Sequence, residues 1–190
     1  MTDVVTSYDH LPEPPAEAPH AAAVLARLVD GLAFRYRWAT DGLDAELLAF
    51  RPCDGWNLGE LLDHLRFLAR WMAQNAAAAR HGTALVTYPE ACADLPDPSG
   101  DPGLYVEQTL TALVSLRTDL LALGDDGLNT IRLIGGNEPS EWPVWNMLNG
   151  PLADALTHVG QVSSWRKLAG SPAPRHDVFR GRPPKGHVAG

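Results

Sequence analysis

Four stretches of the chain carry apolar residues at the three- and four-residue spacing of an amphipathic helix. Such spacing lines one face of a helix with side chains that must be buried against other helices. The pattern therefore predicts an all-α protein, built as an up-down four-helix bundle. The expected helices cover about residues 21–41, 57–82, 104–123 and 140–168.

Proline and glycine mark the expected ends and breaks of these helices. Gly150 and Pro151 lie inside the fourth stretch and should kink or split it. Residues 83–102 are rich in proline and predict a long loop with at most one helical turn. The stretch TIRLI, which follows Asn129, is expected to be a short strand or an extended segment. The predicted organisation is an extended lead-in over 1–19, the bundle over 20–170 and an irregular C-terminal segment over 171–190.

Charge and composition exclude several classes of partner. The formal net charge is −8 and no block of basic residues occurs, which argues against nucleic acid or an anionic membrane surface. No run of about 18 apolar residues is present, so no membrane span is expected. The acidic, proline-rich N-terminus does not resemble a signal peptide. Cys53 and Cys92 are expected to be reduced thiols of a cytoplasmic protein, with a disulfide as the alternative.

Three polar residues fall where apolar ones are expected. Asp154 and His158 are one helical turn apart and share a stripe with Val162 and Trp165. His64 lies at the edge of the apolar stripe of the second helix. Burying these groups is costly unless something compensates. A divalent cation between the two helices would neutralise the carboxylate and satisfy both imidazoles, and the alternative is a structural, hydrogen-bonded polar cluster.

Two motifs add a family resemblance. The segments RPCDGWNLGELLDHL and DALTHVGQVSSWRKLAG resemble the DinB superfamily of bacterial four-helix bundles. In that family the histidine of the first motif is a metal ligand, and a His-x-x-x-His-x-G-Q pattern in the last helix supplies two more. The matching positions are Trp56, Glu60, His64 and Leu65 in the first motif and His158, Gly160 and Gln161 in the second.

The resemblance implies a metal site at His64, Asp154 and His158. Asp154 departs from the pattern, because most members have a histidine there. The related mycothiol-dependent isomerase branch has a carboxylate at this position. Two histidines and one carboxylate suit Zn, Ni, Fe or Mn and leave positions open for water or substrate.

Several functions are compatible with this ligand set. The resemblance favours a metal-dependent enzyme that acts on a small-molecule substrate, specifically a transferase that uses a low-molecular-weight thiol. A metal-dependent hydrolase is the alternative, and a non-catalytic, stress-related binding protein with a structural polar triad is another. The family is also often dimeric, which implies a homodimer. The sequence identifies no catalytic group beyond the three ligands.

Other conspicuous residues have simpler interpretations. Glu60 lies three residues after Asn57 and predicts a capping box. Trp56 and Trp71 are expected in the core. The remaining histidines, at positions 10, 20, 81, 176 and 187, are expected to be solvated in loops and at the ends of the chain. The basic residues of the C-terminal segment are expected to hold it against an acidic bundle.

Overall fold

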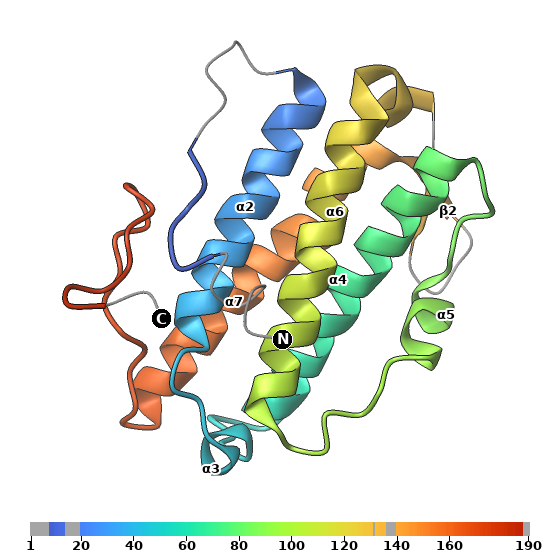
Figure 1. Cartoon of the computed structure of the whole chain (residues 1–190). Helices are drawn as coiled ribbons and strands as arrows, with labels where there is room; N and C mark the ends of the chain where they lie inside the picture. The colour runs from blue at the N-terminus through green and yellow to red at the C-terminus, as the bar shows by residue number, and fades with distance from the viewer. Residues whose placement is uncertain (1–7, 14–19, 131, 136–139, 188–190) are drawn as a thin grey trace.

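The computed structural model describes residues 8–13, 20–130, 132–135 and 140–187. Helices dominate these residues (Figure 1), and none of them is long and apolar enough to cross a membrane. The long helices are α2 (Ala21–Ala39), α4 (Leu58–His81), α6 (Pro102–Thr130) and α7 (Pro151–Leu168). The short elements are α3 (Ala45–Leu48), α5 (Tyr88–Ala93), the 3-10 helix η1 (Val144–Leu148) and an antiparallel pair of strands, β1 (Arg132–Gly135) and β2 (Ser140–Pro143).

The ends of α4 follow from its sequence. The Asn57 side chain accepts a hydrogen bond from the backbone nitrogen of Glu60, and the Glu60 carboxylate accepts one from the backbone nitrogen of Asn57. This confirms the predicted capping box, which fixes where the helix starts. At the other end Gly82 has a φ of 66°, a left-handed conformation that terminates the helix.

A glycine also interrupts α6. Gly124 has φ and ψ angles of 67° and 179°, so the regular helix ends there, as predicted, and a further helical turn follows. The break turns Asp125 towards the start of α2, where its carboxylate accepts hydrogen bonds from the backbone nitrogens of Ala21 and Ala22. The α2 helix has no cap of its own at His20. Asp125 therefore caps it from a distant part of the chain.

The long helices enclose one hydrophobic core. Helix α6 packs against α2 and α4, and α7 packs against the same two helices. The core is built from the apolar stripes that the sequence predicts, with side chains from every long helix fully or almost fully buried. Its members include Val29, Leu61, Leu65, Leu113, Leu116, Leu120, Val159 and Val162.

The directions of the helices differ from the strict alternation predicted by the sequence. Arg66 near the start of α4 bonds to Gln108 near the start of α6, and Arg80 near the end of α4 bonds to Asp119 further along α6. The two helices therefore run in the same direction, as Figure 1 also shows. The prediction included a long loop over 83–102 but not its course, since residues 82–101 return along the full length of α4, about 36 Å, before α6 begins.

The fourth predicted helix, 140–168, is wrong over residues 140–143, which form β2, and is divided where glycine and proline occur. The 3-10 helix η1 ends at Leu148, and α7 starts at Pro151, which occupies the first helical position. Of the predicted extended segment 130–134, residues 132–134 lie in β1, which pairs with β2, whereas Thr130 ends α6. Ile131 lies outside the described residues. Both strands are four residues long, and they connect α6 to η1.

The described part of the C-terminal segment is irregular, as predicted, apart from one isolated bridge between Asp177 and Arg182. Two of its histidines are not solvated as expected. The His176 ring stacks on Trp38 at 6.4 Å between centroids. His187 Nε2 lies 2.9 Å from the carboxylate of buried Asp9. Aromatic and charged partners on α2 and in the lead-in hold these rings, and neither partner was evident from the spacing of the sequence.

Candidate metal centre

The structure brings the three predicted ligands together. His64 comes from the second turn of α4, and Asp154 and His158 come from the first two turns of α7. One ligand atom from each residue lies within 4.8 Å of the other two. Among the described residues, this is the group of histidine, cysteine and carboxylate side chains that meets the geometry of a metal site. Burial of the apolar stripe of α4, which includes Leu61 and Leu65, sets the rotation of that helix and so places His64 towards α7.

Asp154 lies between the two imidazole rings. Its Oδ2 is 3.1 Å from His64 Nε2, and its Oδ1 is 3.3 Å from His158 Nε2. The two rings meet edge to face, with 4.9 Å between centroids. A carboxylate in the first turn of a helix is favoured by the helix dipole alone. The dipole does not account for two imidazole nitrogens converging on the same carboxylate from different helices.

Gln161 defines which nitrogen of His158 carries a proton. Its amide oxygen lies 2.7 Å from His158 Nδ1, so Nδ1 donates a hydrogen bond to it. A neutral imidazole has only one N–H, and Nε2 then presents its lone pair to the Asp154 carboxylate. Two acceptors that face each other repel unless a cation lies between them. That cation is either a second proton on His158 or a metal ion.

Tyr88 plays the corresponding part at His64. The short helix α5 places the Tyr88 hydroxyl 3.3 Å from His64 Nδ1. Burial raises the pKa of Tyr88, and the nearby Cys92 and Asp154 raise it further, so the phenol stays protonated and neutral. His64 Nδ1–H can donate to the phenol oxygen, which leaves Nε2 free as a ligand. No pattern in the sequence indicated Tyr88, because it lies in a segment predicted to be a loop.

Trp56 covers the site instead of entering the core. Its ring centroid lies 5.0 Å from that of His64 and 5.8 Å from that of His158. The residue is 45% exposed, whereas Trp71 is buried as expected. Trp56 directly precedes the N-cap of α4, so its side chain folds over the end of the helix rather than along the apolar stripe. The expectation of a core position for Trp56 is therefore wrong.

The site is open to solvent on the side of the carboxylate. The Asp154 side chain is 47% exposed, whereas those of His64 and His158 are 22% and 15% exposed. With one ligand atom from each residue, the three side chains would occupy three of the four or six positions of a tetrahedral or octahedral ion. Water or a small substrate can therefore reach the remaining positions from the exposed side.

No cysteine forms part of the triad. Both cysteines are free thiols in the structure, as expected, with Cys53 exposed and Cys92 partly buried. Burial raises the pKa of Cys92, although the Arg66 guanidinium opposes the effect. Cys92 is therefore held as a neutral thiol, which is a poor nucleophile.

Comparison with known proteins adds no family to these observations. Protein-family models, curated proteins and solved structures were compared with this chain, and none of them matches it. The function is therefore inferred from the geometry of the site and from the motifs of the sequence.

Proposed function

We propose that the chain binds one divalent transition metal ion at His64, Asp154 and His158 and uses it in catalysis. The observation that supports this most strongly is the arrangement around His158. Its Nδ1 donates to the Gln161 amide oxygen and its Nε2 faces the Asp154 carboxylate, 3.3 Å away, so that two acceptors face each other and repel when the ring is neutral. A metal ion between them would convert this repulsion into two coordination bonds. Zn, Ni, Fe and Mn all accept such a ligand set.

We further propose that the fold is a four-helix bundle of the DinB type. The proposal is supported by the two motifs, which coincide with the two helices that carry the ligands. It is also supported by the mutual packing of α2, α4, α6 and α7 around one core. In the proposed bundle α4 and α6 run parallel, so the helix directions do not strictly alternate.

The proposed reaction is transfer that depends on a low-molecular-weight thiol. A metal ion in an open site lowers the pKa of a coordinated thiol or water and so supplies a nucleophile at neutral pH. Gln161 and Tyr88 hold the two imidazoles with their Nε2 atoms directed at Asp154. Trp56 limits solvent access over both rings, and the exposed side of Asp154 leaves an entrance for a small substrate.

Elemental analysis tests the metal site directly. Protein purified without added metal or chelator should contain about one equivalent of a transition metal, or take it up on reconstitution. No uptake after reconstitution would instead support a structural polar triad in a non-catalytic binding protein. The loaded protein should then consume a low-molecular-weight thiol in the presence of an electrophile. Hydrolysis of an ester or amide without any thiol would identify a hydrolase.

A further inference from the structure

A second concave site lies on the other side of α7. The groove is about 470 Å³ in volume and is formed by α2, α7 and the C-terminal segment. Ser163 lies in it, nine residues after Asp154, which corresponds to a rotation of about 180° around the helix. The groove therefore faces away from the metal triad. Its lining residues are Arg35, Leu156, Val159, Gly160, Ser163, Lys167, Ala173, Pro174, Arg175, His176 and Val178.

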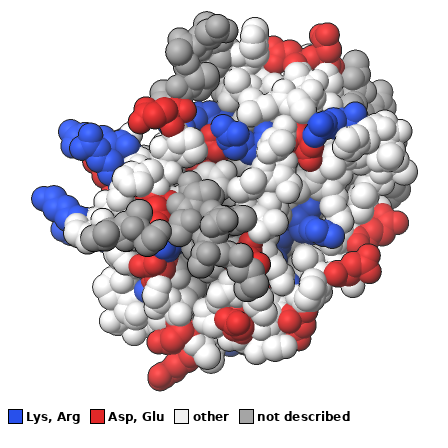
Figure 2. Space-filling view, in the orientation of Figure 1, with Lys and Arg blue, Asp and Glu red and all other residues white. Residues whose placement is uncertain are grey.

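The charged residues of this groove are all basic. Arg35, Lys167 and Arg175 line it, and no acidic residue does. Within the described part of the chain, none of the three forms an ion pair with a carboxylate. Figure 2 shows Lys and Arg side chains along the left edge of the molecule, where Figure 1 places the C-terminal segment. Three uncompensated cations in a chain of net charge −8 focus a positive potential on one cavity.

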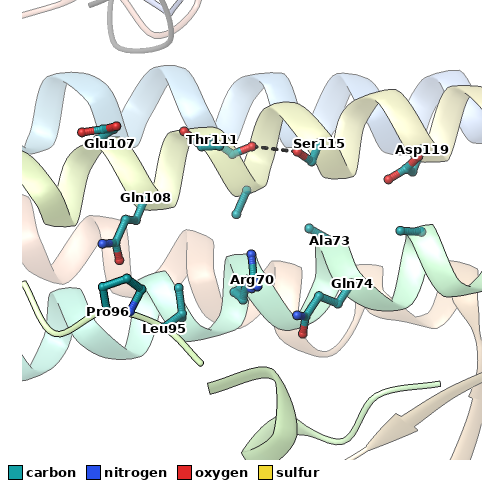
Figure 3. Close-up of a pocket in the computed structure, with 12 residues that line it drawn as sticks. Arg70, Ala73, Gln74, Leu95, Pro96, Glu107, Gln108, Thr111, Ser115 and Asp119 are labelled. Carbon is teal, nitrogen blue, oxygen red and sulfur yellow. Dashed lines mark hydrogen bonds between the residues drawn. The ribbon is translucent and has the colours of Figure 1, made fainter. Parts of the chain in front are cut away.

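A groove of equal volume between α4 and α6 shows the contrast. It is also about 470 Å³ in volume, and Figure 3 shows Arg70, Glu107 and Asp119 around it. Asp119 forms an ion pair with Arg80. Charges of both signs line this second groove, so they largely cancel. The uniformly basic lining therefore distinguishes the α7 groove from the groove between α4 and α6.

The wall formed by the C-terminal segment is held in place. Arg166, which is buried, donates a hydrogen bond from Nε to the backbone oxygen of Ser171. The His176 ring packs against Phe34 and Trp38 of α2. These contacts at both ends fix residues 171–176 against the helices. The groove is consequently a preformed site, which lowers the entropic cost of binding a ligand.

The rest of the lining is aliphatic. Leu156, Val159 and Val178 line the groove beside the cations. Aliphatic surface next to unpaired cations fits a molecule that carries an anionic group on an apolar body. We propose that this groove binds a small aliphatic anion, a carboxylate or phosphate monoester with a hydrocarbon chain, free in solution. The anionic group contacts Arg35, Lys167 and Arg175, and the chain lies along the aliphatic residues.

Titration calorimetry with defined probes tests this proposal. Decanoate and decyl phosphate should bind, and decanoate should bind about tenfold or more tightly than butyrate, because each buried methylene adds affinity. Inorganic phosphate alone should bind weakly. Equal affinities for decanoate and butyrate would overturn the proposal, as would no binding of either decyl probe at millimolar concentration. Binding only to anionic phospholipid vesicles would show that the ligand is a membrane surface and would also overturn it.

Variants locate the binding site. Arg35→Gln, Lys167→Gln and Arg175→Gln should each weaken decanoate binding about fivefold, the effect of one solvent-screened charge contact. The control is Arg70→Gln, which removes an arginine from the other groove and should leave the affinity unchanged. An equal loss in Arg70→Gln would overturn the assignment. His64→Ala should bind decanoate normally, so the outcome is independent of the metal centre.

Discussion

His64 Nε2 lies 3.1 Å from Asp154 Oδ2, although ninety residues separate them in the chain. Two different helices, α4 and α7, must be placed in register for this contact to form. The Asn57 capping box and Pro151 determine where the two helices begin, and the packing of their apolar faces aligns one helix with the other. Under the proposed function, a cation bound by both residues would add to this contact between the two helices.

Replacing any ligand should remove most of the metal. His64→Ala, Asp154→Ala and His158→Ala should each lower metal occupancy sharply, measured by elemental analysis. A ligand that binds only the folded state stabilises it by about 2.7 kcal/mol at a hundredfold excess over Kd. For a domain of this size the melting temperature of the metal-loaded protein should fall by about 5–10 °C.

A chelator and a control variant make this result specific. With chelator present, the melting temperatures of the three variants should lie close to that of the wild type. His81→Ala, at the exposed end of α4, should leave occupancy unchanged. Equal melting shifts with and without chelator would show that the triad acts only as a structural polar cluster.

Acid should release the metal. A histidine must be neutral to coordinate, and histidine side chains generally take up protons between about pH 7 and pH 5. Occupancy after dialysis should therefore fall through this range. A structural cluster without metal would not weaken in this way, because two protonated imidazoles attract a carboxylate more strongly than neutral ones do. Occupancy that stays constant down to pH 5 would contradict coordination by both imidazoles.

Gln161 should influence metal affinity without being a ligand. Gln161→Leu removes the acceptor for His158 Nδ1–H, and the ring loses its fixed orientation. Loss of such a partner typically lowers metal affinity about 10–100-fold. Gln161→Glu keeps an acceptor oxygen and should retain affinity. Competition with a chromophoric chelator measures both, and Ser164→Ala on the exposed side of α7 is the control. Equal affinities for the leucine and glutamate variants would indicate that the Gln161 contact does not orient His158.

Local signals in the sequence predicted much of the fold. The capping box at Asn57, the left-handed Gly82 and the break at Gly124 each act within a few residues, so periodicity and residue type suffice to locate them. The ligand pair on α7 could be predicted for the same reason, since Asp154 and His158 are one turn apart. Their pairing with His64 required the additional expectation that the two helices pack together.

Other features depend on contacts that no local pattern encodes. The direction of α6 relative to α4 depends on the course of residues 82–101, and the length of this connection alone does not determine that course. Tyr88 reaches His64 because α5 folds back from that connection. The outward position of Trp56 depends on the space above the two imidazoles. These are tertiary relationships that emerge only when the helices are assembled.

The cap that Asp125 provides for α2 should make stability depend on pH. Hydrogen bonds from the backbone nitrogens of Ala22 and Ala21 lower the pKa of Asp125 below its ordinary value of 3.8. Its contribution is therefore fully present above pH 3.8 and is lost as the pH falls through the lower folded value. Asp125→Ala should be less stable than the wild type in urea unfolding at pH 7, and the difference should shrink below pH 3.8. Asp54→Ala, which removes an exposed aspartate from the loop before α4, is the control, and a difference that persists unchanged in acid would contradict the cap.

Trp56 should report metal binding by its fluorescence. Its ring centroid lies 5.0 and 5.8 Å from those of His64 and His158, so an ion held by these ligands would lie close to the indole. Open-shell Ni²⁺ quenches an indole at such short range, and addition of Ni²⁺ to the apoprotein should therefore lower the emission.

Two variants distinguish loss of the fluorescence signal from loss of Ni²⁺ binding. Trp56→Phe should lose most of the change in emission while it still binds Ni²⁺, as measured by chelator competition. His64→Ala should lose both the change and the binding, because it removes a ligand and leaves the tryptophan in place. The same fractional quenching in Trp56→Phe as in the wild type would mean that Ni²⁺ binds away from this triad. The emission therefore tests where the ion binds independently of any catalytic activity.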